Sequence, residues 1–290
     1  FQLDHAGARV LIVDAEFLGL AEEALGLAEG RPQLVVVNDV WPAQPITARA
    51  DALDYEVLLA ASDPDVPWSL PDDEWDAISI NYTSGTTGNP KGVVCHHRGA
   101  YLLAQGNALV AQMPRHACYL WTLPMFHCNG WCFPWTLSLM FGTHVCLRQV
   151  RSEPIWDAMD RHGVTHLCGA PTVMSLLTAS VPPSRPKRRV EFFTAAAPPP
   201  ERVLADMEAA GFTVTQLYGL TETYGPAVIN EWHEDWDALD PPARTRKKAR
   251  QGVRYTPLEA LDVLDPVTLE PVPRDGRTIG EVMFRGNVVM

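Results

Sequence analysis

The part of the chain best suited to chemistry is a ten-residue run, residues 83–92 (TSGTTGNPKG), that is rich in glycine, hydroxyl side chains and lysine. It follows residues 77–83 (AISINYT), which have the character of a β-strand. Glycine lets the backbone turn sharply and bring its N–H groups close to an anion, and the hydroxyls and lysine add donors. The run therefore predicts a phosphate-binding loop, with a flexible polar turn as the plain alternative. It is not the P-loop of nucleoside triphosphatases, because Pro90 precedes Lys91 and Gly92 follows it, where that loop needs Gly and then Ser or Thr.

Four other short motifs follow along the chain: residues 123–131 (LPMFHCNGW), 195–198 (AAAP), 218–223 (YGLTET) and 280–286 (GEVMFRG). Together with the phosphate-loop run, their order and spacing resemble the signatures of the adenylate-forming superfamily. That superfamily includes acyl-CoA synthetases, beetle luciferases and the adenylation domains of peptide synthetases. Within it, the chain is similar to the medium-chain acyl-CoA synthetases, and the motifs cover nearly its whole length.

The resemblance implies how ATP is held. The loop and Lys91 would bind the phosphates, the alanine-rich turn would let the backbone approach the adenine, and Tyr218 would stack on that ring. Thr221 would contact the α-phosphate, and Glu222 would hold Mg²⁺. The implied ATP-binding residues are Thr83, Ser84, Gly85, Thr86, Thr87, Gly88, Lys91, Ala195, Ala196, Ala197, Pro198, Tyr218, Gly219 and Thr221.

The chemistry itself asks for such residues. In adenylation a carboxylate attacks the α-phosphorus of ATP and expels pyrophosphate, so charge builds on phosphate oxygens and needs positioned donors and a metal. Lys91 suits the β- and γ-phosphates, and Glu222 suits a hard cation such as Mg²⁺. Outside its motif, Glu222 would be read as a solvated loop carboxylate. The predicted catalytic residues are Lys91, Thr221, Glu222 and His127.

The second motif predicts the acyl pocket. An isolated histidine beside Phe and Met is more often a packed core residue, but the resemblance implies that His127 lines or gates the junction of the acyl and thioester channels, without acid–base chemistry. A bulky Trp131 in the pocket wall predicts a short- to medium-chain or compact acid. The alternative that Trp121, Trp131 and Trp135 are simply core aromatics stays open. The predicted acyl-pocket residues are His127, Asn129, Gly130 and Trp131.

The expected function is therefore ATP-dependent activation of a small carboxylic acid to an acyl-adenylate, followed by thioester formation with coenzyme A. ATP, Mg²⁺ and coenzyme A are the expected cofactors and substrates. One alternative is adenylation for the thiol of a carrier protein. Another is a noncatalytic nucleotide-binding protein descended from such enzymes.

Short β-rich runs alternate with helical stretches, which predicts an α/β fold with mostly parallel sheets. The resemblance implies a layered αβαβα large domain followed by the start of a smaller antiparallel β subdomain. We expect two α/β sheet subdomains in residues 1–217, and the nucleotide-site loop with the start of the β subdomain in residues 218–290. Strands are predicted at 8–14, 33–39, 77–83, 92–96, 118–123, 143–148, 165–169, 190–195, 213–217, 259–264 and 279–285. Helices are predicted at 16–28, 55–61, 99–112, 131–141, 153–162, 172–179 and 200–210.

Composition is that of a globular enzyme: of 290 residues, 47% are hydrophobic and 20% charged. The net charge of −12 argues against nucleic-acid binding. No transmembrane run stands out, and no C-x-x-C pair occurs among the six cysteines, so we expect reduced thiols and a cytoplasmic protein. The basic run 185–189 is predicted to be a solvated loop, and 244–250 is left open between such a loop and contact with the phosphates of coenzyme A or an acidic partner surface.

The ends suggest a piece of a longer enzyme, because the chain opens at Phe1 and ends in an apolar run at residues 286–290. The resemblance implies that a ribose-binding Asp, a hinge and a small C-terminal lid domain, whose Lys assists adenylation, lie beyond this chain. Such a lid excludes water and completes the site. We therefore expect the 290 residues alone to be inactive or only partly active.

Overall fold

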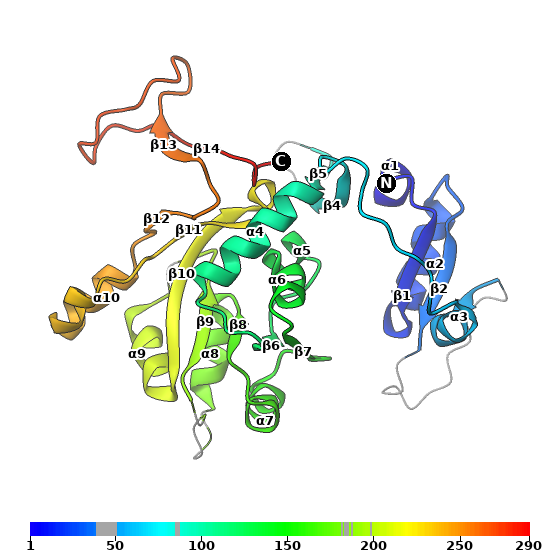
Figure 1. Ribbon diagram of the computed structural model, residues 1–290, viewed down its shortest axis with the longest axis horizontal. Coiled ribbons are helices and arrows are strands. Elements are labelled where there is room, and N and C mark those ends of the chain that lie inside the picture. The colour runs from blue at the N-terminus through cyan, green and yellow to red at the C-terminus, as the bar shows by residue number, and fades with distance from the viewer. Residues whose placement is uncertain (39–50, 85–87, 181, 183–185, 187, 198) are drawn as a thin grey trace. The chain divides into compact units, whose positions relative to one another are not determined.

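The computed structural model describes residues 1–38, 51–84, 88–180, 182, 186, 188–197 and 199–290, and the chain divides into two units (Figure 1). The first unit holds Phe1–Leu70 and Ser84–Pro90, and the second holds Pro71–Thr83 and Lys91–Met290. Among the described residues, no helix has both the length and the apolar character that crossing a membrane requires.

The elements of both units have the following bounds. The strands are β1 (Val10–Asp14), β2 (Gln33–Val37), β3 (Leu53–Asp54), β4 (Ala77–Thr83), β5 (Lys91–His96), β6 (Cys118–Trp121), β7 (Thr143–Cys146), β8 (His166–Cys168), β9 (Val190–Thr194), β10 (Phe212–Leu220), β11 (Gly225–Ile229), β12 (Val253–Arg254), β13 (Ala260–Leu264) and β14 (Glu281–Arg285). The helices are α1 (Gln2–His5), α2 (Leu18–Leu27), α3 (Tyr55–Ala61), α4 (His97–Val110), α5 (Cys128–Trp131), α6 (Phe133–Leu139), α7 (Ser152–His162), α8 (Pro171–Ala179), α9 (Glu201–Ala210) and α10 (Pro241–Lys248). Short 3₁₀ turns are η1 (Ala15–Phe17), η2 (Thr221–Thr223) and η3 (Glu234–Ala238).

The first unit is a small α/β sheet. Strands β1, β2 and β3 pair in parallel in that order. Leu18 and Leu25, seven residues apart and so on one face of α2, are buried in a cluster with Leu34 and Val36 of β2. This unit confirms the strand–helix–strand pattern predicted for its sequence.

The second unit is built on a seven-stranded sheet in the order β12-β11-β10-β9-β8-β6-β7. The strands from β7 to β10 pair in parallel, and β11 and β12 extend the edge in antiparallel fashion. The predicted α/β fold with mostly parallel strands is confirmed.

Alternate residues of these strands face two separate cores, as the period of two in a strand requires. Tyr119 and Phe193 belong to a core that includes side chains of α4, α5 and α6. Their neighbours Leu120 and Phe192 belong to a second core with side chains of α7, α8 and α9. The central strands are therefore buried on both faces, which explains their continuous apolar sequences.

Two antiparallel pairs complete the second unit. Strands β4 and β5 pair on either side of the phosphate-loop run, with Thr83 opposite Lys91. Strands β13 and β14 pair in antiparallel register, as predicted for the small β subdomain.

The stretch after Tyr218 differs from the sequence-based expectation. The division placed between residues 217 and 218 falls inside β10, which runs from Phe212 to Leu220, and β11 and β12 then return to the same sheet. Helix α10 was not predicted, because it has no buried residue and hence no apolar periodicity. Its start is nevertheless marked by Asp240, which accepts from the N–H of Ala243, and by Pro241 in its first turn. Most of the basic run 244–250 thus lies in a helix.

Candidate active site

A cavity of about 310 Å³ in the second unit lies where the carboxyl ends of β9 and β10 meet other segments. In open α/β sheets, ligands bind in the crevice at the carboxyl ends of the strands. Its walls come from the end of β4, from α5 and the residue before it, from the loop after β9, and from the end of β10 through η2 into β11. The lining residues are Thr83, His127, Cys128, Trp131, Ala195, Ala196, Leu217, Tyr218, Gly219, Leu220, Thr221, Glu222, Gly225 and Pro226.

Most of the predicted site residues that the structure describes meet in this cavity. Those that line it are Thr83, His127, Trp131, Ala195, Ala196, Tyr218, Gly219, Thr221 and Glu222. Lys91, Asn129, Gly130 and Ala197 belong to the same unit but do not line it, and Ser84 and Gly88 belong to the first unit. Gly85, Thr86, Thr87 and Pro198 lie outside the described residues. The assigned roles stay predictions.

Strand pairing places Lys91 beside one residue of the cavity wall. Lys91 is the first residue of β5 and lies opposite Thr83, the last residue of β4, which lines the cavity. The Lys91 side chain is exposed. Its predicted role toward the phosphates stays a prediction.

The adenine side of the predicted site is shaped by backbone as much as by side chains. A β-bulge lies between Tyr218 and Gly219, and a Cβ built on Gly219 would stand 1.7 Å from the carbonyl oxygen of Gly225. Only glycine fits this approach. Ala196 in the facing loop has φ +80°, a conformation that costs a non-glycine residue energy and tends to persist at functional sites. The Tyr218 ring stacks on Phe284 with centroids 6.3 Å apart.

Thr221 and Glu222 lie beside a thiol that sequence reasoning did not single out. The Cys128 sulfur lies 3.4 Å from the Thr221 hydroxyl oxygen. Burial raises the pKa of the Cys128 thiol, and the nearby Glu222 carboxylate acts in the same direction, while the contact with Thr221 opposes them. Cys128 is therefore a neutral part of the wall at neutral pH.

The segment that carries Trp131 has an unusual backbone. Five consecutive residues, 128–132, have φ between 44° and 62°, which makes α5 a left-handed turn. Each L-residue in that conformation costs about 1–2 kcal/mol. Two hydrogen bonds to the Asn129 carboxamide oxygen, from Ser79 at 2.6 Å and Asn81 at 2.7 Å, fix the turn to β4. Asn129 thus holds the pocket wall in place, although it was predicted to line the acyl pocket.

Gly130 also supports the pocket wall. A Cβ at this position would stand 2.7 Å from the Trp121 ring, so the indole packs directly on its backbone. Trp131 is both a core residue and a lining residue, because it is 8% exposed, belongs to the core beside α4, and lines the cavity. Trp121 and Trp135 do not line the cavity.

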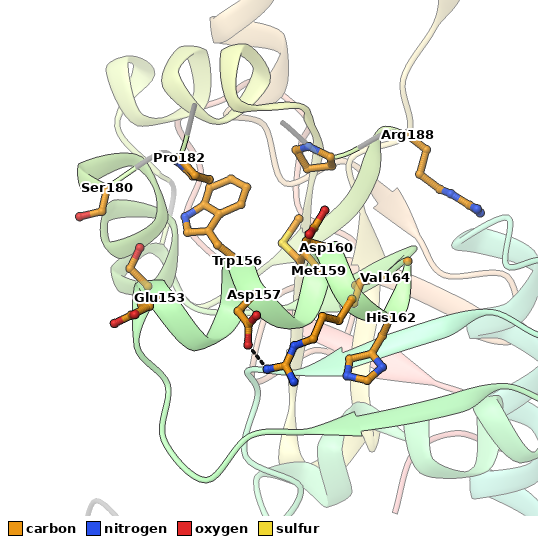
Figure 2. A pocket seen from close by; sticks show the side chains of 14 residues that line it. Glu153, Trp156, Asp157, Met159, Asp160, His162, Val164, Ser180, Pro182 and Arg188 are labelled. Carbon is orange, nitrogen blue, oxygen red and sulfur yellow. Dashed lines mark hydrogen bonds and ion pairs between the residues drawn. The ribbon is translucent and has the colours of Figure 1, made fainter. Parts of the chain in front are cut away.

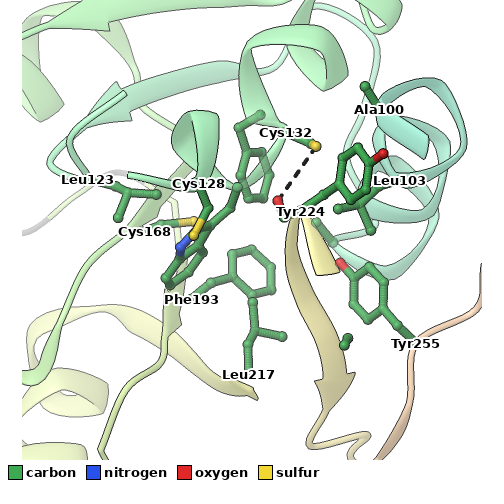
Figure 3. Packing of buried hydrophobic residues seen from close by; sticks show 14 of the residues in the cluster. Ala100, Leu103, Leu123, Cys128, Cys132, Cys168, Phe193, Leu217, Tyr224 and Tyr255 are labelled. Atoms are coloured by element: carbon green, nitrogen blue, oxygen red, sulfur yellow. Dashed lines mark hydrogen bonds between the residues drawn. The ribbon is translucent and has the colours of Figure 1, made fainter. Parts of the chain in front are cut away.

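Tyr224 links the site to the phosphate-loop hairpin. It is 2% exposed, and the backbone N–H of His96 at the end of β5 donates to its hydroxyl oxygen at 2.7 Å. Figure 3 shows its ring among buried side chains, with the Cys132 thiol directed at its carbonyl oxygen. A Cβ on Gly99 would meet the Tyr224 ring at 2.5 Å, so the start of α4 packs tightly on it. The end of β5 and the turn between β10 and β11 are therefore held together.

The lining residues that the sequence analysis missed are Cys128, Leu217, Leu220, Gly225 and Pro226. Cys128 stands inside a motif that was already assigned to the pocket, so its position carried the signal. Leu217 is a buried strand residue, indistinguishable by sequence from any other core leucine. Gly225 and Pro226 belong to β11, which was not predicted.

A second cavity, of about 740 Å³, lies along α7 and the residues that follow α8 (Figure 2). Asp157 and Arg161 form an ion pair on its wall. None of the predicted site residues that the structure describes lines it.

The residues that line the cavity fit a magnesium ion that is bound together with a nucleotide. Glu222 is a half-buried carboxylate that faces the cavity beside the Thr221 hydroxyl. Proteins usually hold Mg²⁺ by one or two carboxylates together with substrate phosphates, rather than by a complete protein cage. Across the described ranges, no three His, Cys, Asp or Glu side chains gather as metal ligands.

Comparisons with known proteins identify the family of this chain. The chain is 47% identical over 308 residues to an acetate/butyrate–CoA ligase of Arabidopsis thaliana that is named peroxisomal, and 46% identical over 304 residues to an acetate–CoA ligase of Humulus lupulus. Both alignments cover 100% of this chain and 53% of the relative, so the chain spans about half the length of the curated relatives it matches.

Among solved structures, the luciferase-like enzyme of the mealworm Zophobas morio matches 100% of this chain and 64% of its own, with a TM-score of 0.80 and 21% identity. That likeness supports the fold. The family model described as AMP-binding enzyme matches residues 1–290 in full. This chain therefore belongs to the AMP-binding enzyme family.

Proposed function

We propose that this chain is the larger part of the ATP-binding domain of an acid–CoA ligase, which activates a small carboxylic acid to an acyl-adenylate and passes it to coenzyme A. The observation that carries the proposal is the cavity of about 310 Å³, which is lined by some of the residues expected to hold adenine, α-phosphate, metal and acid. Since the chain spans 53% of its relatives, the complete reaction is proposed for the longer protein.

The proposed roles follow the positions of the side chains. Lys91 neutralises the phosphates that leave as pyrophosphate, and Thr221 donates to the α-phosphate as negative charge develops on it. Glu222 would hold Mg²⁺, which would stabilise charge on the phosphate oxygens. His127 is exposed at the rim of the cavity and lines the passage between acid and thiol without taking a proton.

The acid is proposed to be short or compact. Trp131 occupies the wall with a large ring whose backbone is fixed on both sides, since the Asn107 amide donates to its carbonyl oxygen and a Cβ on Gly225 would meet its Cα at 2.9 Å. The backbone that carries the ring is therefore fixed, and the residue is only 8% exposed. The names of the two relatives, which refer to acetate and butyrate, support the same range.

Coenzyme A and Mg²⁺ enter as part of the same proposal, supported by the named activities of the relatives and by the chemistry of Glu222. The six cysteines are free thiols, which favours a reducing compartment. The cytoplasmic location stays a prediction, because one relative is named peroxisomal.

The test is acid-dependent ATP–pyrophosphate exchange by the longer protein, with the 290-residue chain assayed in parallel, across linear acids from acetate to decanoate and one aromatic acid. We expect exchange to peak with short acids and to fall about 10²–10³-fold in Lys91→Ala and Glu222→Gln. Glu231→Gln, an exposed carboxylate that does not line the cavity, is the matched control. Release of AMP that requires free coenzyme A separates the ligase from carrier-protein loading. Nucleotide binding without exchange for any acid would reject the proposal.

A further inference from the structure

The left-handed turn at residues 128–132 is fixed to β4 through one side chain. The carboxamide oxygen of Asn129 accepts from the Ser79 hydroxyl at 2.6 Å and from the Asn81 amide at 2.7 Å. Both bonds are partly buried, and Asn81 itself is only 8% exposed. A carboxamide oxygen has two lone pairs, so these two bonds use its accepting capacity in full. The Asn129 oxygen therefore serves the fold of the site and does not bind a substrate.

The face of β4 that holds Asn129 continues to the cavity. Successive side chains of a strand point to opposite faces, so Ser79, Asn81 and Thr83 share one face of β4. Thr83 is the last residue of this strand and lines the cavity. Lys91 lies directly opposite Thr83 in the antiparallel pair, and residues that lie opposite one another stand on the same face. The two bonds to Asn129 therefore fix the face of the β4–β5 hairpin that carries both Thr83 and Lys91.

Other side chains of the same turn contact the segment expected to hold the α-phosphate. The Cys128 sulfur lies 3.4 Å from the Thr221 hydroxyl oxygen in η2. The Cys132 thiol donates to the carbonyl oxygen of Tyr224, the residue after η2, at 3.7 Å. Between these two cysteines in sequence, Trp131 lines the cavity. One short turn thus contacts the β4–β5 hairpin through Asn129 and the η2 segment through its cysteines.

We propose that Asn129 is a positioning residue for adenylation, which sets Thr83 and Lys91 in register with the turn whose Trp131 lines the acid pocket. The inference rests on the proposed function. In that reaction a carboxylate oxygen forms a bond to the α-phosphorus as the bond to pyrophosphate breaks, so the acid and the phosphates must be held in one fixed arrangement. A misplacement of about 1 Å can cost a factor of about 100 in rate. Asn129 touches neither substrate and acts through the hairpin.

The test is a double-mutant cycle on acid-dependent ATP–pyrophosphate exchange by the longer protein. Asn129→Gly removes the acceptor and suits the left-handed backbone, since φ at this position is +44°. We expect the exchange rate at saturating ATP and acetate to fall about 10- to 100-fold. In a Lys91→Ala background the same substitution should lower the rate by less than about threefold, because the lysine that Asn129 positions is already absent and the two effects do not add.

Two further variants separate positioning from folding. Ser79→Ala removes a donor to Asn129 and should lower the rate by less than about threefold when added to Asn129→Gly. Ser138→Ala changes an exposed hydroxyl of α6 outside the cavity and should leave the exchange rate unchanged.

The outcomes that overturn the inference can be told apart. An equal fold loss from Asn129→Gly with and without Lys91 would mean that the substitution only reduces the amount of folded protein, which would refute the positioning role alone. Absence of exchange in the unmodified longer protein would reject the proposed function and this inference with it.

Discussion

Replacing Tyr224 by phenylalanine removes a single hydroxyl and keeps the ring that packs on Gly99. That hydroxyl oxygen accepts the backbone N–H of His96 at 2.7 Å, and both residues are buried, at 2% and 8% exposed. The variant leaves a buried N–H without a partner, which costs about 1–3 kcal/mol. Because the bond joins β5 to the loop after β10, the loss should be felt first at the end of the phosphate-loop hairpin.

Hydrogen exchange of the His96 amide measures this effect directly. A cost of about 1–3 kcal/mol corresponds to exchange that is about five- to 150-fold faster in Tyr224→Phe. Tyr101→Phe is the control, because Tyr101 lies on α4 with 64% of its surface exposed and should change stability by less than about 0.5 kcal/mol. Unchanged exchange at His96 in a folded Tyr224→Phe chain would refute the idea that this bond clamps the two strands.

Three further results are expected. Gly219→Ala places a Cβ 1.7 Å from the carbonyl oxygen of Gly225, so the free energy of unfolding measured by urea titration should fall by about 3 kcal/mol or more. A loss below about 1 kcal/mol would mean that the bulge can shift to make room. Burial raises the pKa of the Cys132 thiol well above 9.0, so the folded state holds the thiol proton more tightly than the unfolded state does, and the resulting stability is present below pH 9.0 and declines above it. Cys132→Ala should therefore flatten the fall in melting temperature between about pH 8 and 10. An equal fall in both proteins would contradict this. Trp131→Leu in the longer protein should shift the exchange optimum toward longer acids, and an unchanged ranking would assign Trp131 to the core alone.

Much of the fold could be predicted because the second unit obeys simple periodicity. Strands such as β6 and β9 are buried on both faces, so their apolar runs stand out from the amphipathic helices between them. Helix α10 could not be found in this way, since every one of its side chains is at least partly exposed. Strand β11 is buried throughout, but it follows directly on the YGLTET motif, and nothing local signals that the chain turns back.

The candidate site was predictable to the extent that its residues are contiguous in motifs. Tyr218, Thr221 and Glu222 come from one short segment, and a strand that ends at the sheet edge brings them to the cavity. Asn129 shows where such reasoning stops. It belongs to a pocket motif, yet its carboxamide oxygen is used by Ser79 and Asn81, which are about fifty positions away in sequence. Long-range contacts of this kind depend on the register of β4, which the motif does not encode.

The left-handed turn at residues 128–132 also has a consequence for the order in which the molecule assembles. Local chain preferences oppose this conformation, so the turn cannot act as a nucleus, and its stabilising partners reach it only after β4 is in place. Contacts that form after the rate-limiting step affect how fast a protein unfolds rather than how fast it folds. The part of the cavity wall that this turn forms should therefore be among the last parts of the second unit to assemble, and weakening Asn129 should shorten the lifetime of the native state without slowing its formation.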